Sequence, residues 1–84
     1  MPYIKTVDRV RIDQWADRPL LVTVGEMNYY VTRLIHDYLA ENGTNYANIN
    51  ACVGMLECCK LELYRRLAAP YEDTKIAENG DVFV

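Results

Sequence analysis

Apolar side chains repeat at helical spacing in the first half of the stretch from Thr23 to Ala69 of this 84-residue chain. They recur at i, i+3, i+4, i+7, i+8, i+11 and i+12, which is the spacing of one buried face of an α-helix. The residues at these positions are Met27, Tyr30, Val31, Leu34, Ile35, Tyr38 and Leu39. The spacing therefore predicts an amphipathic helix.

Both ends of this helix carry recognisable signals. Thr23 and Glu26 have the spacing of a capping box, in which the hydroxyl and the carboxylate each accept a hydrogen bond from a backbone N–H that the first turn leaves unpaired. At the other end, Asn42 and Gly43 favour the left-handed backbone that ends a helix. We therefore expect the helix to run from the capping box to Asn42.

A second helix is predicted to begin at Thr44 or Asn45, since either side chain can cap it. Its stripe is Ile49, Cys52, Val53, Leu56, Lys60, Leu63 and Leu67. Lys60 interrupts this stripe, and we expect its ammonium to reach water or Glu57. Gly54 lowers helix propensity, which a close helix crossing would explain. The fold predicted for the chain is all-α, with three to four helices around a central antiparallel hairpin.

Shorter elements are predicted on either side of the hairpin. Asp13 is a suitable N-cap for a short helix carrying Trp15, which Pro19 ends and which covers the hairpin. Pro70 cannot continue a hydrogen-bonded helix but suits the first turn of a new one, which Asn79 and Gly80 close. Both ends of the chain carry apolar residues. Residues 2–5 and 82–84 either pair as a short two-stranded ribbon or remain unpaired.

Length and charge limit the classes of function. A single domain of residues 1–84 buries a small core, so we predict a homo-oligomer. Seven tyrosines are typical of surfaces that become interfaces. A net charge of −3 disfavours nucleic acid as a partner. No long apolar run or leader pattern is seen, which predicts a cytoplasmic protein without a membrane association.

The cysteines do not indicate a disulfide framework or a metal centre. The number of cysteines is odd, which favours free thiols; they are Cys52, Cys58 and Cys59. Cys58 and Cys59 point about 100° apart on a helix, so a zinc site with His36 is disfavoured, and no cofactor is predicted. The chain has no serine, and a Cys–His pair would need two helices to place it, so we predict that the protein is not an enzyme.

Four segments of the chain read G-E-M-N-Y-Y-V-T-R-L-I-H-D-Y-L, G-T-N-Y-A-N-I-N, L-E-C-C-K-L-E-L-Y-R-R and A-P-Y-E-D-T-K-I-A-E-N-G-D-V. In this order the chain resembles a family of small proteins of unknown function found in bacteria and tailed phages. The resemblance extends from M-P-Y-I to N-G-D-V and departs between Asp13 and Val24, where the family has a longer helix. It implies a helical, cytosolic protein of a bacterium or phage and brings no activity with it.

Two polar clusters are candidate ligand-binding residues. Tyr29, Arg33 and His36 share the side of the first helix opposite its core face, where a ring can stack on a base and a guanidinium can hold a phosphate. Tyr64, Arg65 and Arg66 form the second cluster near the end of the second helix. The alternatives are a solvated face for the first cluster, and pairing of both arginines with Glu62 for the second.

These clusters lead to a hypothesis about function. The preferred one is a non-catalytic oligomer that holds a small anionic or nucleotide-type ligand, by analogy with small phage proteins that sequester the nucleotide signals of bacterial defence. The alternative is a protein-interaction adaptor with a tyrosine-rich interface.

Overall fold

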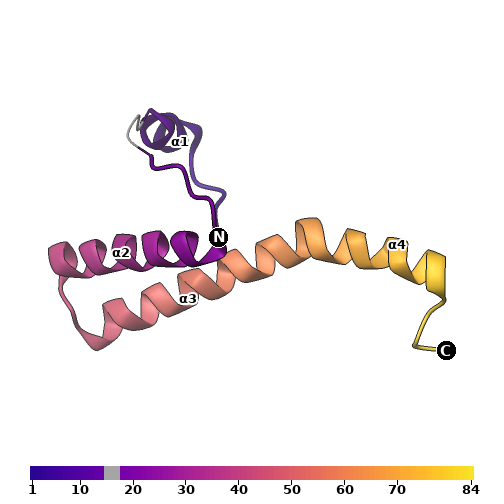
Figure 1. Ribbon diagram of the computed structural model, residues 1–84. Helices are drawn as coiled ribbons and strands as arrows, with labels where there is room; N and C mark the ends of the chain where they lie inside the picture. The colour runs from indigo at the N-terminus through magenta and orange to yellow at the C-terminus, as the bar shows by residue number, and fades with distance from the viewer. Residues whose placement is uncertain (15–17) are drawn as a thin grey trace. The chain divides into compact units, whose positions relative to one another are not determined.

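The computed structural model describes residues 1–14 and 18–84, and every regular element among them is helical. The elements are α1 (Thr6–Asp13), α2 (Val24–Asn42), α3 (Tyr46–Leu63), the π-helical turn η1 (Tyr64–Ala68) and α4 (Ala69–Asn79), as Figure 1 shows. The all-α prediction is therefore confirmed. Residues 2–5 and 82–84 form no strand, so of the two alternatives for these residues the structure does not support the terminal ribbon.

The described chain forms two compact units. One contains Pro2–Val53, and the other contains Gly54–Val84 together with Met1. Helix α3 contributes to both, because Val53 and Gly54 are consecutive residues of that helix. The predicted packing of α2 against α3 as an antiparallel hairpin stays a prediction, as does the single domain.

Helix α2 begins and ends where the sequence indicates. The N–H of Glu26 donates to Thr23 Oγ1 at 3.1 Å, which confirms the capping threonine. The Glu26 carboxylate instead accepts a hydrogen bond from the Thr23 hydroxyl at 3.1 Å, so the second half of the expected capping box differs. Gly43 ends the helix with φ 110°, and its N–H donates to Leu39 O at 2.8 Å.

The connection between α2 and α3 is held by two asparagines. Asn45 is the cap of α3, because the N–H of Asn48 donates to Asn45 Oδ1 at 2.9 Å. The side-chain amide of Asn48 donates to the carbonyls of Asn42 and Gly43, at 3.1 and 3.0 Å. These bonds satisfy carbonyls that the end of α2 leaves unpaired. Of the two predicted caps, Thr44 or Asn45, the structure selects Asn45.

The helix does not break before Pro70, contrary to the sequence prediction. Figure 1 shows α3 continuing through η1 into α4 without a loop. In an α-helix the ring of Pro70 would clash with the carbonyl four residues earlier. The π turn avoids this, since the N–H of Ala69 donates to Tyr64 O five residues back. Pro70 then occupies the first turn of α4, and α4 ends at Asn79 before Gly80, as predicted.

Helix α1 lies where no helix was predicted. It spans Thr6–Asp13, so Asp13 is its last residue rather than the N-cap of a later helix. Val7 and Val10 weaken the sequence signal because β-branched residues favour strands. The N–H groups of Asp8 and Arg9 both donate to Lys5 O, which starts the helix. The expected placement of Trp15 over the hairpin lies outside the described residues.

Little apolar surface is buried in the described chain. The predicted face of α2 is half-buried at Tyr30, Val31, Ile35 and Leu39. Among residues 1–14 and 18–84, Cys52 is the one buried hydrophobic side chain, at 9 % exposure. Apart from its chain neighbours and the backbone of its own helix, no described atom lies within 4 Å of the position that a Cβ of Gly54 would take, so the close helix crossing predicted there is absent from the described chain. The folded chain therefore leaves most of its apolar side chains exposed.

Candidate functional site

The first candidate cluster lies on α2. Tyr29, Arg33 and His36 follow one another at four and three residues, which places them on one side of the helix. Tyr29 is 68 % exposed. His36 Nδ1 lies 3.3 Å from Asp37 Oδ1, and both side chains are exposed. Arg33 makes no ion pair with any described residue.

A shallow hollow of about 410 Å³ lies beside Tyr29, within the unit Pro2–Val53. Its lining residues are Pro19, Leu20, Leu21, Gly25, Glu26, Tyr29 and Tyr30. Most of these side chains are apolar, and the charged one, Glu26, would repel an anion. Neither Arg33 nor His36 belongs to the lining. The hollow therefore suits an apolar group better than a phosphate.

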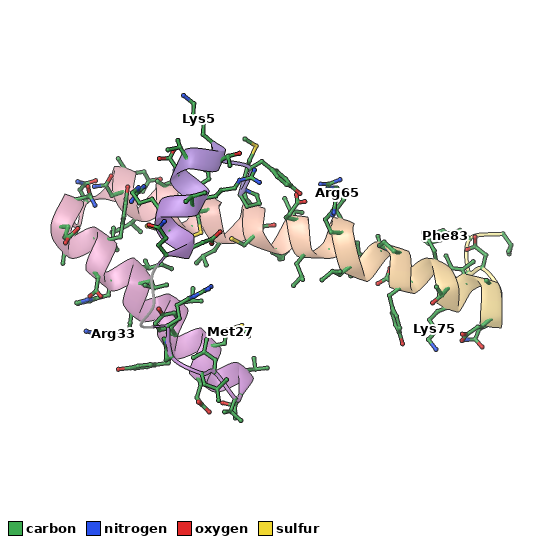
Figure 2. All side chains as sticks on the ribbon, turned by 90° about the horizontal axis from the view of Figure 1, so that it is seen from above. Lys5, Met27, Arg33, Arg65, Lys75 and Phe83 are labelled. Atoms are coloured by element: carbon green, nitrogen blue, oxygen red, sulfur yellow. The ribbon has the colours of Figure 1, made fainter. Side chains whose placement is uncertain are left out.

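The second candidate cluster occupies the π turn η1. Arg65 Nη2 lies 2.6 Å from Glu62 Oε1, which confirms the pairing that the sequence predicted for Arg65. Figure 2 shows the Arg65 side chain reaching outward from its helix. Arg66 forms no ion pair within the described residues, so the pairing with Glu62 predicted for it is absent there. The two arginines therefore differ in their contacts within the described chain.

Tyr64 makes a contact that the sequence analysis missed. Its hydroxyl donates a 2.8 Å hydrogen bond to Glu72 Oε2, eight residues along the chain and across η1. In a regular α-helix residues eight apart are rotated by about 80°, so the π turn brings these side chains into line. The carboxylate accepts this bond and its negative charge is nearby, and both effects raise the pKa of Tyr64.

Replacing Glu72 by alanine is expected to lower the pKa of Tyr64 toward the ordinary tyrosine value of about 10. A raised pKa means that the folded chain favours the neutral phenol. The bond therefore contributes fully below the ordinary pKa and is lost as pH rises through the raised pKa. A pH titration of ¹³C-labelled tyrosines by NMR, assigned with Tyr64→Phe, measures the change. Asp73→Ala is the control, and an equal decrease in that variant would contradict the assignment.

The two clusters belong to different units of the chain. Tyr29, Arg33 and His36 lie in Pro2–Val53, whereas Tyr64, Arg65 and Arg66 lie in Gly54–Val84. Each cluster keeps its own residues together, because its members are neighbours on one helical segment. Convergence of both clusters on one ligand stays a prediction.

The three cysteines are free thiols that differ in their exposure. Cys52 is buried, whereas Cys58 and Cys59 are exposed. The Sγ atom of Cys59 lies 3.7 Å from Met55 Sδ. Within residues 1–14 and 18–84, no group of three or more His, Cys, Asp or Glu side chains could hold a metal ion. The same residues contain no helix that is both long and apolar enough to traverse a bilayer.

Comparison with known families shows which family the chain belongs to. A family model described as "Domain of unknown function (DUF6899)" matches residues 1–82. The chain belongs to this family. No curated protein and no solved structure matches the chain. The match confirms that the chain belongs to a family of unknown function, as the sequence resemblance implied, and it assigns no activity.

Proposed function

We propose that this DUF6899 protein is a non-catalytic binding protein that works as a homo-oligomer. The observation that carries the proposal is the exposure of its apolar side chains, since Cys52 is the one buried hydrophobic residue in the described chain. Apolar surface on this scale is typical of chains that bury it against another molecule. Oligomers of identical chains are the commonest way to cover such surface.

The proposed ligand is a small anion of nucleotide type. Two observations support this class. Tyr29 and Arg33 lie one helical turn apart, so a ring and a guanidinium can contact one base and one phosphate. Arg33 and Arg66 also have no acidic partner among the described residues. In this proposal the protein sequesters its ligand and does not convert it.

Thermal-shift measurements test the ligand proposal. The unmodified protein is titrated with cyclic dinucleotides and ADP-ribose derivatives, and with neutral nucleosides as the matched ligand control. We expect anions to raise the melting temperature. We expect Arg33→Ala to weaken their binding by about tenfold, the loss of one charge-assisted contact. Arg11→Ala is the control variant, because Arg11 pairs with Asp8 on α1 at 3.8 Å. The absence of any shift with anions would overturn the proposed ligand.

A second candidate function is a protein-interaction adaptor. The hollow beside Tyr29 favours it, since its apolar lining and Glu26 suit an apolar side chain with a neighbouring cation. Here Tyr29→Ala is expected to weaken recovery of a partner protein at least tenfold and leave helicity unchanged. Tyr46→Ala is the control, because Tyr46 is 85 % exposed and does not line the hollow. Equal recovery with both variants would exclude the adaptor hypothesis for this surface.

A further inference from the structure

An exposed apolar stripe runs along the unit Gly54–Val84. Leu56, Leu63, Leu67 and Tyr71 are spaced by seven, four and four residues, so they follow one side of the continuous helical run. Their exposures are 41, 60, 64 and 62 %. Side chains of this size on one helix face are typical of a surface that packs against another helix.

No described helix reaches the far end of this stripe from the turn that connects α2 to α3. The helical run from Tyr46 to Asn79 is 34 residues long, with 18 residues in α3, five in η1 and 11 in α4. Helix α2 has 19 residues. Even if α2 packs along α3 from the connecting turn, as the sequence predicts, it ends well before the end of the run. In the structure the near part, Leu56 and Leu63, is 41 and 60 % exposed, and the far part, Leu67 and Tyr71, lies beyond the end of α2.

Charged residues form an ordered row beside the stripe. Glu57 and Lys60 are in contact at 3.1 Å, and Tyr64 bonds to Glu72 at 2.8 Å. Lys75 follows Glu72 by three residues, and its Nζ lies 3.1 Å from Glu78 Oε2 and 5.6 Å from the centre of the Tyr71 ring. Lys60 precedes Tyr64 by four residues, so the bond from Tyr64 to Glu72 brings Lys60, Glu72 and Lys75 to one flank of the helix. Along the chain its charges read negative, positive, negative and positive, at Glu57, Lys60, Glu72 and Lys75.

This order of charges distinguishes the two ways of pairing two copies. In a parallel two-fold pair this flank faces the opposite flank of the second copy, so its charges do not pair with one another. In an antiparallel pair the order is reversed. Glu57 then lies opposite Lys75, and Lys60 lies opposite Glu72, with the two-fold axis at Arg66 for both pairs. One flank is therefore complementary to itself in the antiparallel orientation.

We propose that the stripe Leu56–Leu63–Leu67–Tyr71 is the interface with a second copy of this chain, in an antiparallel two-fold pair centred on η1. This inference rests on the proposed homo-oligomer and adds its surface, orientation and register. The apolar side chains interdigitate across the axis, and the flanking row sets which residues face one another. The intrahelical contact between Glu57 and Lys60 holds both groups on the flank where the second copy needs them.

Sedimentation velocity on the full chain over a range of concentrations tests the surface. We expect Leu63→Glu to weaken dimerisation at least a hundredfold, because each dimer contains two copies of the substitution. Leu61→Glu is the matched control, since Leu61 is 56 % exposed but lies about 160° away around α3. This control substitution should change the dissociation constant of the dimer less than threefold. Equal loss in both variants would overturn the proposed surface. A chain that is monomeric at all concentrations would overturn the homo-oligomer as well.

Charge reversal tests the register without depending on the apolar variants. Lys60→Glu or Glu72→Lys alone is expected to weaken dimerisation about tenfold. In the double variant the dissociation constant of the dimer should return to within about threefold of that of the original protein. Failure of the double variant to recover would overturn the register.

The native cysteines test the orientation. In the antiparallel pair the two Cys59 residues are about 20 Å apart, a separation of 14 helical positions, so mild oxidation should form no intermolecular disulfide. Rapid cross-linking through Cys59 would show a parallel pair and overturn the proposal.

Discussion

Replacement of Gly43 by alanine is expected to lower the free energy of unfolding by about 2 kcal/mol. Gly43 has φ 110° and ψ 130°, a backbone conformation that residues with a Cβ rarely adopt. The added Cβ would lie 3.1 Å from Asn45 Nδ2 and 3.7 Å from Asn48 Nδ2. These asparagines respectively cap α3 and bind the end of α2. Backbone strain and the loss of these hydrogen bonds would therefore both lower the free energy of unfolding. Urea denaturation at a fixed protein concentration measures the change.

Gly54 provides the control for this substitution. It lies inside α3, and apart from its chain neighbours and the backbone of its own helix no described atom is within 4 Å of its Cβ position. Gly54→Ala should therefore raise the free energy of unfolding by about 0.5–1 kcal/mol, the difference in helix propensity. The same substitution then has opposite signs at the two glycines. A destabilising effect at Gly54 would indicate a close approach at this position in the oligomer, and an unchanged stability at Gly43 would contradict the turn geometry.

Replacement of Cys52 by aspartate is expected to cost about 3 kcal/mol near neutral pH. Cys52 is 9 % exposed, and an unpaired carboxylate in such a place loses most of its hydration. Burial should raise the pKa of the introduced carboxyl group above its ordinary value. The folded chain then favours the protonated acid, so the loss is full above the raised pKa and decreases as pH falls through it. Helicity and urea denaturation at pH 7 and at pH 4 measure both effects.

Cys58→Asp is the matched variant, since Cys58 is exposed six residues further along α3. It should change the free energy of unfolding by less than about 0.5 kcal/mol. Thiol reactivity gives an independent measure in the unmodified protein. Two thiols should react rapidly with a thiol reagent and one slowly, because Cys58 and Cys59 are exposed and Cys52 is buried. Three equally reactive thiols would contradict the burial of Cys52.

Local signals in the sequence predicted much of the helical structure. Thr23, Gly43 and Gly80 act through their own side chain or backbone, so their effect on a helix end does not depend on the rest of the fold. The same applies to Pro70 in the first turn of α4. The choice between Thr44 and Asn45 could not be made from sequence, because both residues can cap. It depends on the hydrogen bond that the Asn45 side chain accepts from the N–H of Asn48.

Features that depend on competing preferences were missed. Helix α1 contains Val7, Val10 and Ile12, whose preference for strands hides the helical pattern. The π turn η1 was missed because Pro70 normally ends a helix, and sequence alone does not show that a wider turn can avoid the clash. The choice between a terminal ribbon and unpaired termini could not be made from sequence, because apolar composition gives no register and no third strand to support a pair.

The candidate site was predicted in part. Helical spacing was sufficient to place Tyr29, Arg33 and His36 together on α2, and to pair Arg65 with Glu62. The apolar hollow beside Tyr29 could not be anticipated, because it depends on residues 19–21 before the helix. The hydrogen bond from Tyr64 to Glu72 depends on the π turn. Since the π turn was not predicted from the sequence, this bond was not predicted either.

The π turn also has a consequence for how this family can vary. A π turn holds one more residue than the corresponding turn of an α-helix. A relative that lacks one residue between 64 and 68 would restore regular winding there, and its last helix would keep its orientation, because five residues of a π turn wind about as far as four residues of an α-helix. The apolar positions of that helix would then keep facing the same neighbour. One-residue deletions in this turn, with an unchanged pattern downstream, are what we expect among related sequences.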